Sequence, residues 1–210
     1  VSPLQRLWSM SVQAQYCAVA ILLVAAIVAL ARRAGRPEAV RPMLIGTLLV
    51  TTVASFGYAT HIGALRQGWA YYDTAARFWE LGAGALAGLL IGRIVLSGRI
   101  RAALGVAGFL VVCLGGVVID GAAHFPGPWA LVPVGAALAV ILAGADPDSP
   151  TTVTRLLGSR PLLFLGSIAY PLYLWHWPIL IAVLDAGATV NPLTGAVIVA
   201  ASVILDRKSV

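Results

Sequence analysis

Residues 12–31 read VQAQYCAVAILLVAAIVALA and contain no charged side chain. A helix of about 20 apolar residues can cross the hydrocarbon layer of a bilayer, about 30 Å thick, because each residue adds about 1.5 Å. This stretch therefore predicts a transmembrane helix. The whole chain has the same character, since 60% of its 210 residues are hydrophobic and only 10% are charged. These figures exclude a soluble globular enzyme and a disordered chain, and they indicate an integral membrane protein.

Seven stretches are apolar and long enough to be membrane helices, with short loops rich in Pro, Gly, Asp and Arg between them. They are residues 12–31, 42–59, 74–96, 100–120, 129–145, 161–184 and 192–206. The third stretch carries charges and the fifth is short, but leaving either unspanned would expose backbone polar groups to lipid or reverse every later loop. We therefore predict an all-α fold, a polytopic membrane helical bundle of about seven transmembrane helices that forms a single domain over residues 1–210.

The basic residues set the orientation, because Lys and Arg in short loops are retained on the cytoplasmic side. With the amino terminus extracytoplasmic, all but Arg6, Arg66 and Arg77 of the 14 basic residues fall on the inner side. The net charge of +6 is then a topology signal, and we expect no nucleic-acid partner. Residues 1–11 contain no signal peptide, so an odd number of preceding membrane helices is the simplest explanation of an outer amino terminus.

Polar side chains within apolar helices point to function, because each costs several kcal/mol in lipid unless it faces the interior of the bundle. Gln13 and Gln15 lie at the predicted outer end of the first helix. Arg77 and Glu80 lie three residues apart near the outer end of the third helix. They share a face, where an ion pair lowers the cost of burying both charges. An interfacial anchor and a purely structural ion pair are the alternative interpretations.

Residues 167–178, in the sixth predicted helix, read SIAYPLYLWHWP. The spacing places Tyr173, His176 and Trp177 on one side of a helix. Each of the two prolines removes a backbone donor, which predicts a kink or a freed carbonyl group that faces a cavity. A histidine among aromatic residues in a membrane span favours a functional role, and a packing residue is the alternative.

Three glycines recur at four-residue spacing in the third predicted helix and predict a smooth ridge on which another helix packs closely. They are Gly84, Gly88 and Gly92. The other two histidines, His61 and His124, fall in predicted outer loops. No metal-ligand spacing joins them to His176, so we expect no metal site.

Three predicted outer segments, taken together and in order, resemble the bacterial acyltransferase type 3 family. They are LWSMSV at residues 7–12, RFWELG at 77–82 and SIAYPLYLWHWP at 167–178. The resemblance covers essentially the whole chain and implies a domain of ten membrane helices, of which about three would precede Val1. Where the family usually has SVEEQFY, residues 11–17 read SVQAQYC, so both carboxylates are missing.

This resemblance implies a multi-pass enzyme of the bacterial cytoplasmic (inner) membrane. It would move an acyl group, usually acetyl, from cytoplasmic acyl-coenzyme A to a hydroxyl group of a carbohydrate such as lipopolysaccharide or another cell-envelope or secreted polysaccharide. Acyl-coenzyme A is the donor, and the carbohydrate acceptor and membrane lipids are the expected partners. The histidine that the family uses in its first helix has no counterpart here, so we expect this chain alone to be inactive. The oligomeric state is not predicted.

The polar residues at the predicted outer ends of the helices and the same resemblance together give eight candidate site residues. The catalytic candidates are His176, Glu80 and Arg77, and the substrate-binding candidates are Gln13, Gln15, Tyr173, Trp175 and Trp177. The group around His176 would form a polar wall that binds sugar or stabilises charge, and the ion pair would fix that wall. Two other interpretations stay open, namely a transporter-like binding module built on the kinked helix and a non-catalytic remnant.

Overall fold

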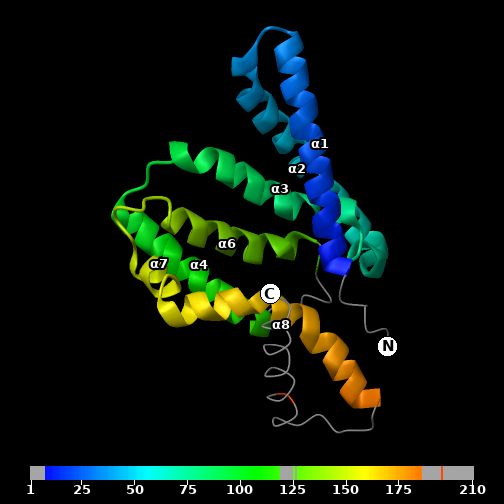
Figure 1. The fold of residues 1–210 in the computed structure, drawn as a ribbon, viewed down its shortest axis with the longest axis vertical. Coiled ribbons are helices and arrows are strands. Elements are labelled where there is room, and N and C mark those ends of the chain that lie inside the picture. Colours follow the sequence, from blue (N-terminus) through cyan, green and yellow to red (C-terminus); the bar gives the residue numbers. More distant parts are fainter. Residues whose placement is uncertain (1–7, 119–124, 126, 186–194, 196–210) are drawn as a thin grey trace. The chain divides into compact units, whose positions relative to one another are not determined.

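The computed structural model describes residues 8–118, 125, 127–185 and 195, and every regular element in them is a helix (Figure 1). The α-helices are α1 (Trp8–Arg33), α2 (Val40–Ala70), α3 (Thr74–Leu90), α4 (Gly98–Val118), α6 (Leu131–Ala143), α7 (Thr152–Leu157) and α8 (Arg160–Asp185). Three short 3-10 helices accompany them, at Pro37–Ala39, Ile91–Arg93 and Pro128–Ala130. The prediction of an all-α membrane protein is confirmed.

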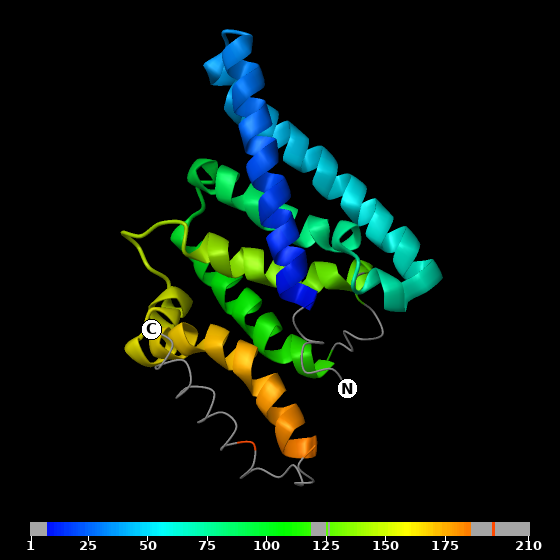
Figure 2. The same ribbon diagram turned by 45° about the vertical axis from the view of Figure 1, so that its right-hand side comes forward.

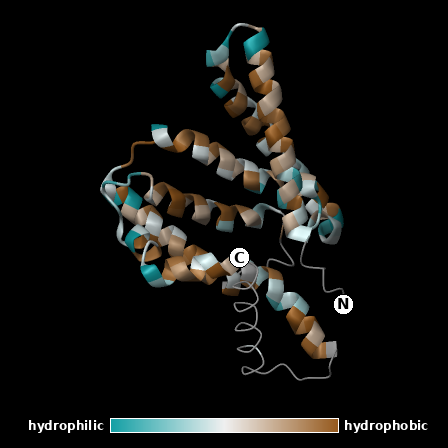
Figure 3. Cartoon of the chain, in the orientation of Figure 1, coloured by the Kyte–Doolittle hydropathy of each residue, from teal (hydrophilic) through white to brown (hydrophobic). Residues whose placement is uncertain are grey.

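Contacts divide the chain into two compact units. The larger unit comprises residues 11–155 and holds α2, α3, α4, α6 and most of α1. The smaller unit comprises residues 1–10 and 156–210 and holds α8. Hydrophobic residues cover most of α4 and α6, and hydrophilic residues gather at the turn between α1 and α2 (Figure 3). This distribution is the one expected of helices that lie in a bilayer.

Fewer helices than predicted are long enough to cross a bilayer by themselves. Within the described residues, three helices have the length and apolar composition of a membrane span, or four if the two halves of α8 form one. The third and fifth predicted spans are helical, but α3 has 17 residues and α6 has 13, short of the usual length of about 20. The predicted span 192–206 lies outside the described residues, apart from Gly195.

The turn between α1 and α2 depends on a glycine. Gly35 has a φ of 66°, a left-handed conformation that glycine adopts without a steric cost. The backbone N–H of Arg36 then donates to the carbonyl oxygen of Ala31 at 2.9 Å, which satisfies one of the free carbonyl groups at the end of α1. The chain reverses here, and α1 and α2 run side by side in opposite directions (Figure 1, Figure 2).

The second helix is longer than predicted. It spans Val40–Ala70, whereas the sequence predicted a membrane helix over 42–59 followed by an outer loop. The prediction that His61 lies in a loop is therefore wrong, because the helix continues through it. Apolar residues beyond the predicted end explain the extension, since Ile62 packs against the buried core. The helical geometry breaks only at Arg66, where φ is −146° and ψ is 63°.

Close helix packing uses other glycines than the predicted ridge. A Cβ atom on Gly84, Gly88 or Gly92 would meet no described atom within 4 Å, so the prediction of a close contact there is wrong for the described residues. In α4, a Cβ atom on Gly108 would lie only 2.6 Å from the carbonyl oxygen of Ala136 in α6. The absence of a side chain at Gly108 therefore lets these two backbones approach.

The buried core of the larger unit lies where α2, α3 and the start of α6 meet. Its members are Ala59, Ala76, Trp79 and Ala130. Trp79 is only 2% exposed, and the ring of Phe56 packs edge-on against it with 5.0 Å between ring centroids. This cluster fixes the first two turns of α3, which carry the charged residues singled out by the sequence.

Candidate functional site

The start of α3 holds the predicted ion pair. Asp73 caps the helix, because its Oδ1 accepts a hydrogen bond from the backbone N–H of Ala75 at 3.1 Å. One turn later, Nη1 of Arg77 donates to both carboxylate oxygens of Glu80, at 3.1 and 3.3 Å. The prediction that these two residues share a face and pair is confirmed.

Further contacts orient the Arg77 guanidinium group. Its Nε donates to the backbone carbonyl oxygen of Tyr71 at 3.2 Å, and its Cζ lies 4.6 Å from the centroid of the Tyr71 ring. The side chains of Arg77 and Glu80 are only 12% and 24% exposed. The guanidinium group thus has hydrogen bonds, an aromatic ring face and an opposite charge around it. These interactions offset the free-energy cost of removing it from water.

A serine of α2, which the sequence analysis did not single out, locks α2 to this part of α3. The hydroxyl group of Ser55 donates to the carbonyl oxygen of Ala75 at 2.6 Å and accepts from the backbone N–H of Trp79 at 2.9 Å. In a regular helix those two backbone groups would bond to each other, so Ser55 stands between them. The sequence feature that could have pointed to Ser55 is a small polar residue within an apolar helix.

The first helix brings one of its two glutamines to the start of α3. The Thr74 hydroxyl group donates to Oε1 of Gln15 at 2.7 Å, and the rings of Tyr16 and Phe78 lie 4.9 Å apart. Gln13 lies on α1 as well, with its side chain exposed. Gln15 therefore belongs to the polar end of α3, while no described contact joins Gln13 to it.

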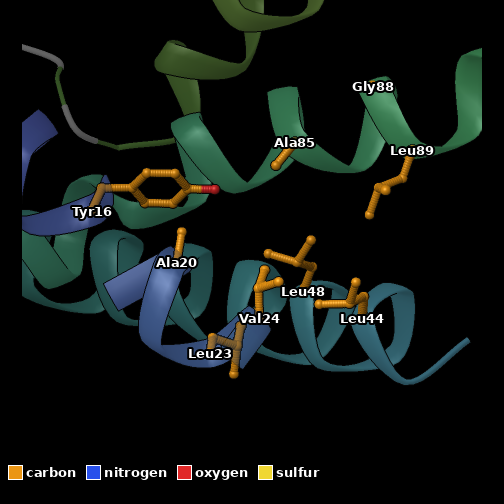
Figure 4. Close-up of a pocket in the computed structure, with 9 residues that line it drawn as sticks. All are labelled: Tyr16, Ala20, Leu23, Val24, Leu44, Leu48, Ala85, Gly88 and Leu89. Carbon is orange, nitrogen blue, oxygen red and sulfur yellow. The ribbon is translucent and has the colours of Figure 1, made fainter. Parts of the chain in front are cut away.

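An apolar groove of about 300 Å³ runs between α1, α2 and α3 (Figure 4). It is lined by Tyr16, Ala20, Leu23, Val24, Leu44, Leu48, Ala85, Gly88 and Leu89. Tyr16 contributes the one polar side-chain atom among these lining residues, and its hydroxyl group points into the space between the helices (Figure 4). The chemistry of this lining suits a hydrocarbon chain and not a sugar.

The second group of candidate residues lies on α8, in the smaller unit. The halves Arg160–Tyr170 and Leu172–Leu184 meet at 56°, so the predicted kink at Pro171 is confirmed. The rings of Tyr173 and His176 lie 6.1 Å apart between centroids, as expected for residues on one side of a helix.

The neighbours of Tyr173 and His176 complete the description of the candidate residues on α8. The Tyr173 hydroxyl group shares a hydrogen bond with the hydroxyl group of Ser9, at 2.5 Å. Trp177 is partly buried, and Trp175 is 36% exposed. Within the smaller unit, Tyr173 is thus tied to the beginning of the chain, a contact that sequence spacing did not reveal.

A hydrogen bond to its own helix orients the ring of His176. Nδ1 lies 2.7 Å from the carbonyl oxygen of Leu172. A carbonyl oxygen only accepts, so this bond requires the proton on Nδ1. In the neutral tautomer with this proton, Nε2 is a lone pair that accepts a proton or a hydrogen bond.

The candidate residues belong to both units. Gln15 and the Arg77–Glu80 pair lie in the larger unit, and Tyr173 and His176 lie in the smaller one. Across the described residues, no three His, Cys, Asp or Glu side chains gather in a way that could hold a metal ion. His124, the remaining histidine of the predicted loops, lies outside the described residues.

Comparisons with known proteins give the chain its family. The sequence model described as "Acyltransferase domain", of the acyltransferase type 3 family, matches residues 1–205. The chain belongs to this family. It is also 28% identical over 176 residues to the "Putative membrane-bound transacylase BcsY" of Komagataeibacter xylinus. That match covers 84% of the chain but 41% of the relative, so the chain spans less than half the length of this curated relative. No solved structure matches it.

Proposed function

We propose that this chain forms part of a membrane O-acyltransferase of the bacterial cytoplasmic membrane, where it crosses the bilayer several times. The enzyme transfers an acyl group, acetyl in the simplest case, from acyl-coenzyme A to a hydroxyl group of a cell-envelope or secreted carbohydrate. The family match over residues 1–205 and the named transacylase relative support acyl transfer. The nature of the donor and acceptor rests on the resemblance of the three outer segments.

The observation that carries the proposal is the setting of His176. Its ring lies on an apolar helix beside Tyr173, and Nδ1 bonds to Leu172 while Nε2 is the ring nitrogen left for a substrate. Alcohols react with thioesters only slowly unless a group accepts the hydroxyl proton. A neutral histidine with an available lone pair is the side chain best suited to accept a hydrogen bond from the sugar hydroxyl group.

The reaction balances without a metal or a redox cofactor. The sugar oxygen attacks the carbonyl carbon of the thioester while its proton passes to a base, and the resulting tetrahedral intermediate breaks its C–S bond. Coenzyme A leaves as the thiol, and the acyl group remains on the sugar as an ester. We assign His176 and Tyr173 to holding the acceptor hydroxyl group, with Trp175 and Trp177 beside it against the sugar, because polar tips on apolar rings fit a carbohydrate.

The Arg77–Glu80 pair is assigned to a positioning role. The donors of Arg77 are directed at Glu80 and at the carbonyl group of Tyr71, so the pair holds the start of α3 in place. Gln15 and Gln13 are assigned to the acceptor as hydrogen-bonding groups at the end of α1.

The test is acyl transfer by the native gene product that contains residues 1–210. Membrane vesicles holding this protein receive radioactive acetyl-coenzyme A and cell-envelope carbohydrate, and the label in carbohydrate esters is measured. Label in esters supports the proposal. A transporter-like module, which the bend of α8 would also serve, predicts carbohydrate flux into vesicles without ester formation. Neither activity from a correctly inserted protein would favour the non-catalytic remnant and contradict the proposal.

A further inference from the structure

A second pocket of the larger unit lies where α2 ends and α3 begins. It is lined by Gly68, Trp69, Tyr72, Asp73 and Thr74, and its volume is about 390 Å³. The orientation predicted by the basic residues puts this end on the outer side of the membrane. Unlike the groove between α1, α2 and α3, this pocket combines aromatic rings with a carboxylate and a hydroxyl group.

Two aromatic side chains of this pocket are more than half exposed. Trp69 is 56% exposed and Tyr72 is 51% exposed, and they flank the last turn of α2. Large rings with a polar tip offer contact area at a small cost in side-chain entropy. The faces of such rings suit the C–H groups of a pyranose, while charged or polar groups beside them suit its hydroxyl groups.

Asp73 supplies an acceptor for those hydroxyl groups. Its Oδ1 accepts one hydrogen bond in the cap of α3, and a carboxylate oxygen can accept a second one from a ligand. Oδ2 is buried, and Tyr58 lies within hydrogen-bonding reach of the carboxylate. Oδ1 is therefore the oxygen that a sugar hydroxyl group would reach.

The rim of the pocket continues the same chemistry. Thr74 lines the pocket, and its hydroxyl group donates to Gln15 on α1. The amide nitrogen of Gln15 lies 3.4 Å from the hydroxyl group of Ser11, to which it donates. Hydrogen-bonding side chains thus extend from the pocket to Gln15, which the sequence analysis identified as a substrate-binding candidate.

We propose that this pocket is a subsite for one sugar ring of the acceptor, with the ring stacked on Trp69 and Tyr72 and a hydroxyl group donating to Asp73. The inference rests on the proposed function, which supplies the carbohydrate. The negative charge of Asp73 makes the subsite selective for neutral or amino sugars, because a uronate or phosphate group would be repelled.

The test measures binding directly on the native gene product in phospholipid nanodiscs, without acyl-coenzyme A. Glycoside detergents are avoided, because they carry the ligand chemistry themselves. Saturation-transfer NMR is recorded with cellobiose and maltose, and with glucuronic acid as the anionic contrast. We expect saturation of the ring protons of at least one disaccharide and a clearly weaker signal for glucuronic acid. Absence of saturation for both disaccharides would overturn the proposal.

Variants locate the binding. Trp69→Ala and Asp73→Asn should each weaken binding about tenfold, the factor expected when one charge-assisted bond or one ring contact is lost. Trp69→Phe keeps a ring and should retain most of the binding. Asn also caps helices well, so Asp73→Asn preserves α3. The matched control is Trp129→Ala, an equally exposed tryptophan outside the pocket, at 55%.

The control separates a sugar subsite from an aromatic anchor in the membrane interface. If the two tryptophans are only anchors, Trp69→Ala and Trp129→Ala will have the same effect on disaccharide binding, and the proposal fails. The acyl-transfer assay separates the two proposals. Ester formation with unchanged rates in Trp69→Ala and Asp73→Asn would overturn the subsite alone. Disaccharide binding that depends on Trp69, without ester formation, would overturn the proposed function alone.

Discussion

The polar residues of α3 and those of α8 are held in different ways. On α3, the guanidinium group of Arg77 is fixed by Glu80 and by Tyr71, and Ser55 of α2 ties the same turns to a second helix. On α8, the ring of His176 bonds to the carbonyl group of Leu172 in its own helix. The first arrangement is a network of hydrogen bonds that joins several elements. In the second, a single hydrogen bond within one helix orients the ring. The comparison suggests that changes on α3 act on stability and changes at His176 act on chemistry.

The largest effect is expected from His176→Ala, which removes the lone pair at Nε2. We expect acyl transfer to fall by about 10²-fold, because the acceptor hydroxyl group loses the hydrogen bond that positions it, with little change in thermal stability. The assay is initial-rate transfer from labelled acetyl-coenzyme A by the native gene product. His61→Ala is the matched control, because His61 is exposed on α2. Equal rates in both variants would remove His176 from the mechanism.

Glu80→Gln removes the ion pair, so the largely buried charge of Arg77 loses its carboxylate partner. We expect a loss of about 1–3 kcal/mol in the free energy of unfolding, less than for a fully buried pair because Glu80 keeps some exposure. Thermal unfolding in nanodiscs measures it. Glu38→Gln, at an exposed glutamate, is the control. If the two variants have the same melting temperature, the ion pair contributes nothing to stability and the contrast between α3 and α8 is wrong.

Gly82→Ala and Gly84→Ala sharpen the account of how α3 packs. A Cβ atom on Gly82 would overlap with Oγ1 of Thr52 in α2, whereas one on Gly84 would meet nothing within 4 Å. We expect Gly82→Ala to destabilise by about 1–2 kcal/mol and Gly84→Ala to stabilise by up to about 1 kcal/mol through helix propensity. The same unfolding assay gives both values. A reversed order would mean that α3 presents a different face to α2.

The smallest effect concerns the shape of α8. Pro171→Ala restores a backbone donor, so the helix should straighten. Spin labels at positions 163 and 184, placed in a background without Cys17 and Cys113, report the change. We expect the mean distance between the labels to lengthen by about 3 Å, from the rise per residue and the loss of the bend. An unchanged distance would show that tertiary packing, and not Pro171, bends the helix.

Sequence reasoning was most successful where the pattern is local. Uninterrupted apolar runs predicted the helices, i, i+3 spacing predicted the Arg77–Glu80 pair, and Pro171 predicted the bend of α8. These features depend on residues close in the chain, whose relative positions helix geometry determines.

Features that depend on partners distant in the chain were missed. The spacing of Gly84, Gly88 and Gly92 describes one face but not which face another helix covers. The close contacts are at Gly82 and Gly108 instead. The bridge from Ser55 to α3 was likewise hidden, because a serine in an apolar helix can equally bond to its own backbone. The extension of α2 through His61 was missed because the predicted membrane span ended at residue 59 and glycines and aromatic residues surround His61.

The most direct test of the central claim is the fate of the acetyl group. Vesicles with the native gene product are supplied with radioactive acetyl-coenzyme A and envelope carbohydrate, and the label is sought as an alkali-labile ester. The account predicts label on carbohydrate oxygen, released as acetate by mild base, with an equal amount of free coenzyme A thiol. Label that stays in acetyl-coenzyme A or appears only as free acetate, with the protein inserted in the membrane, would contradict it.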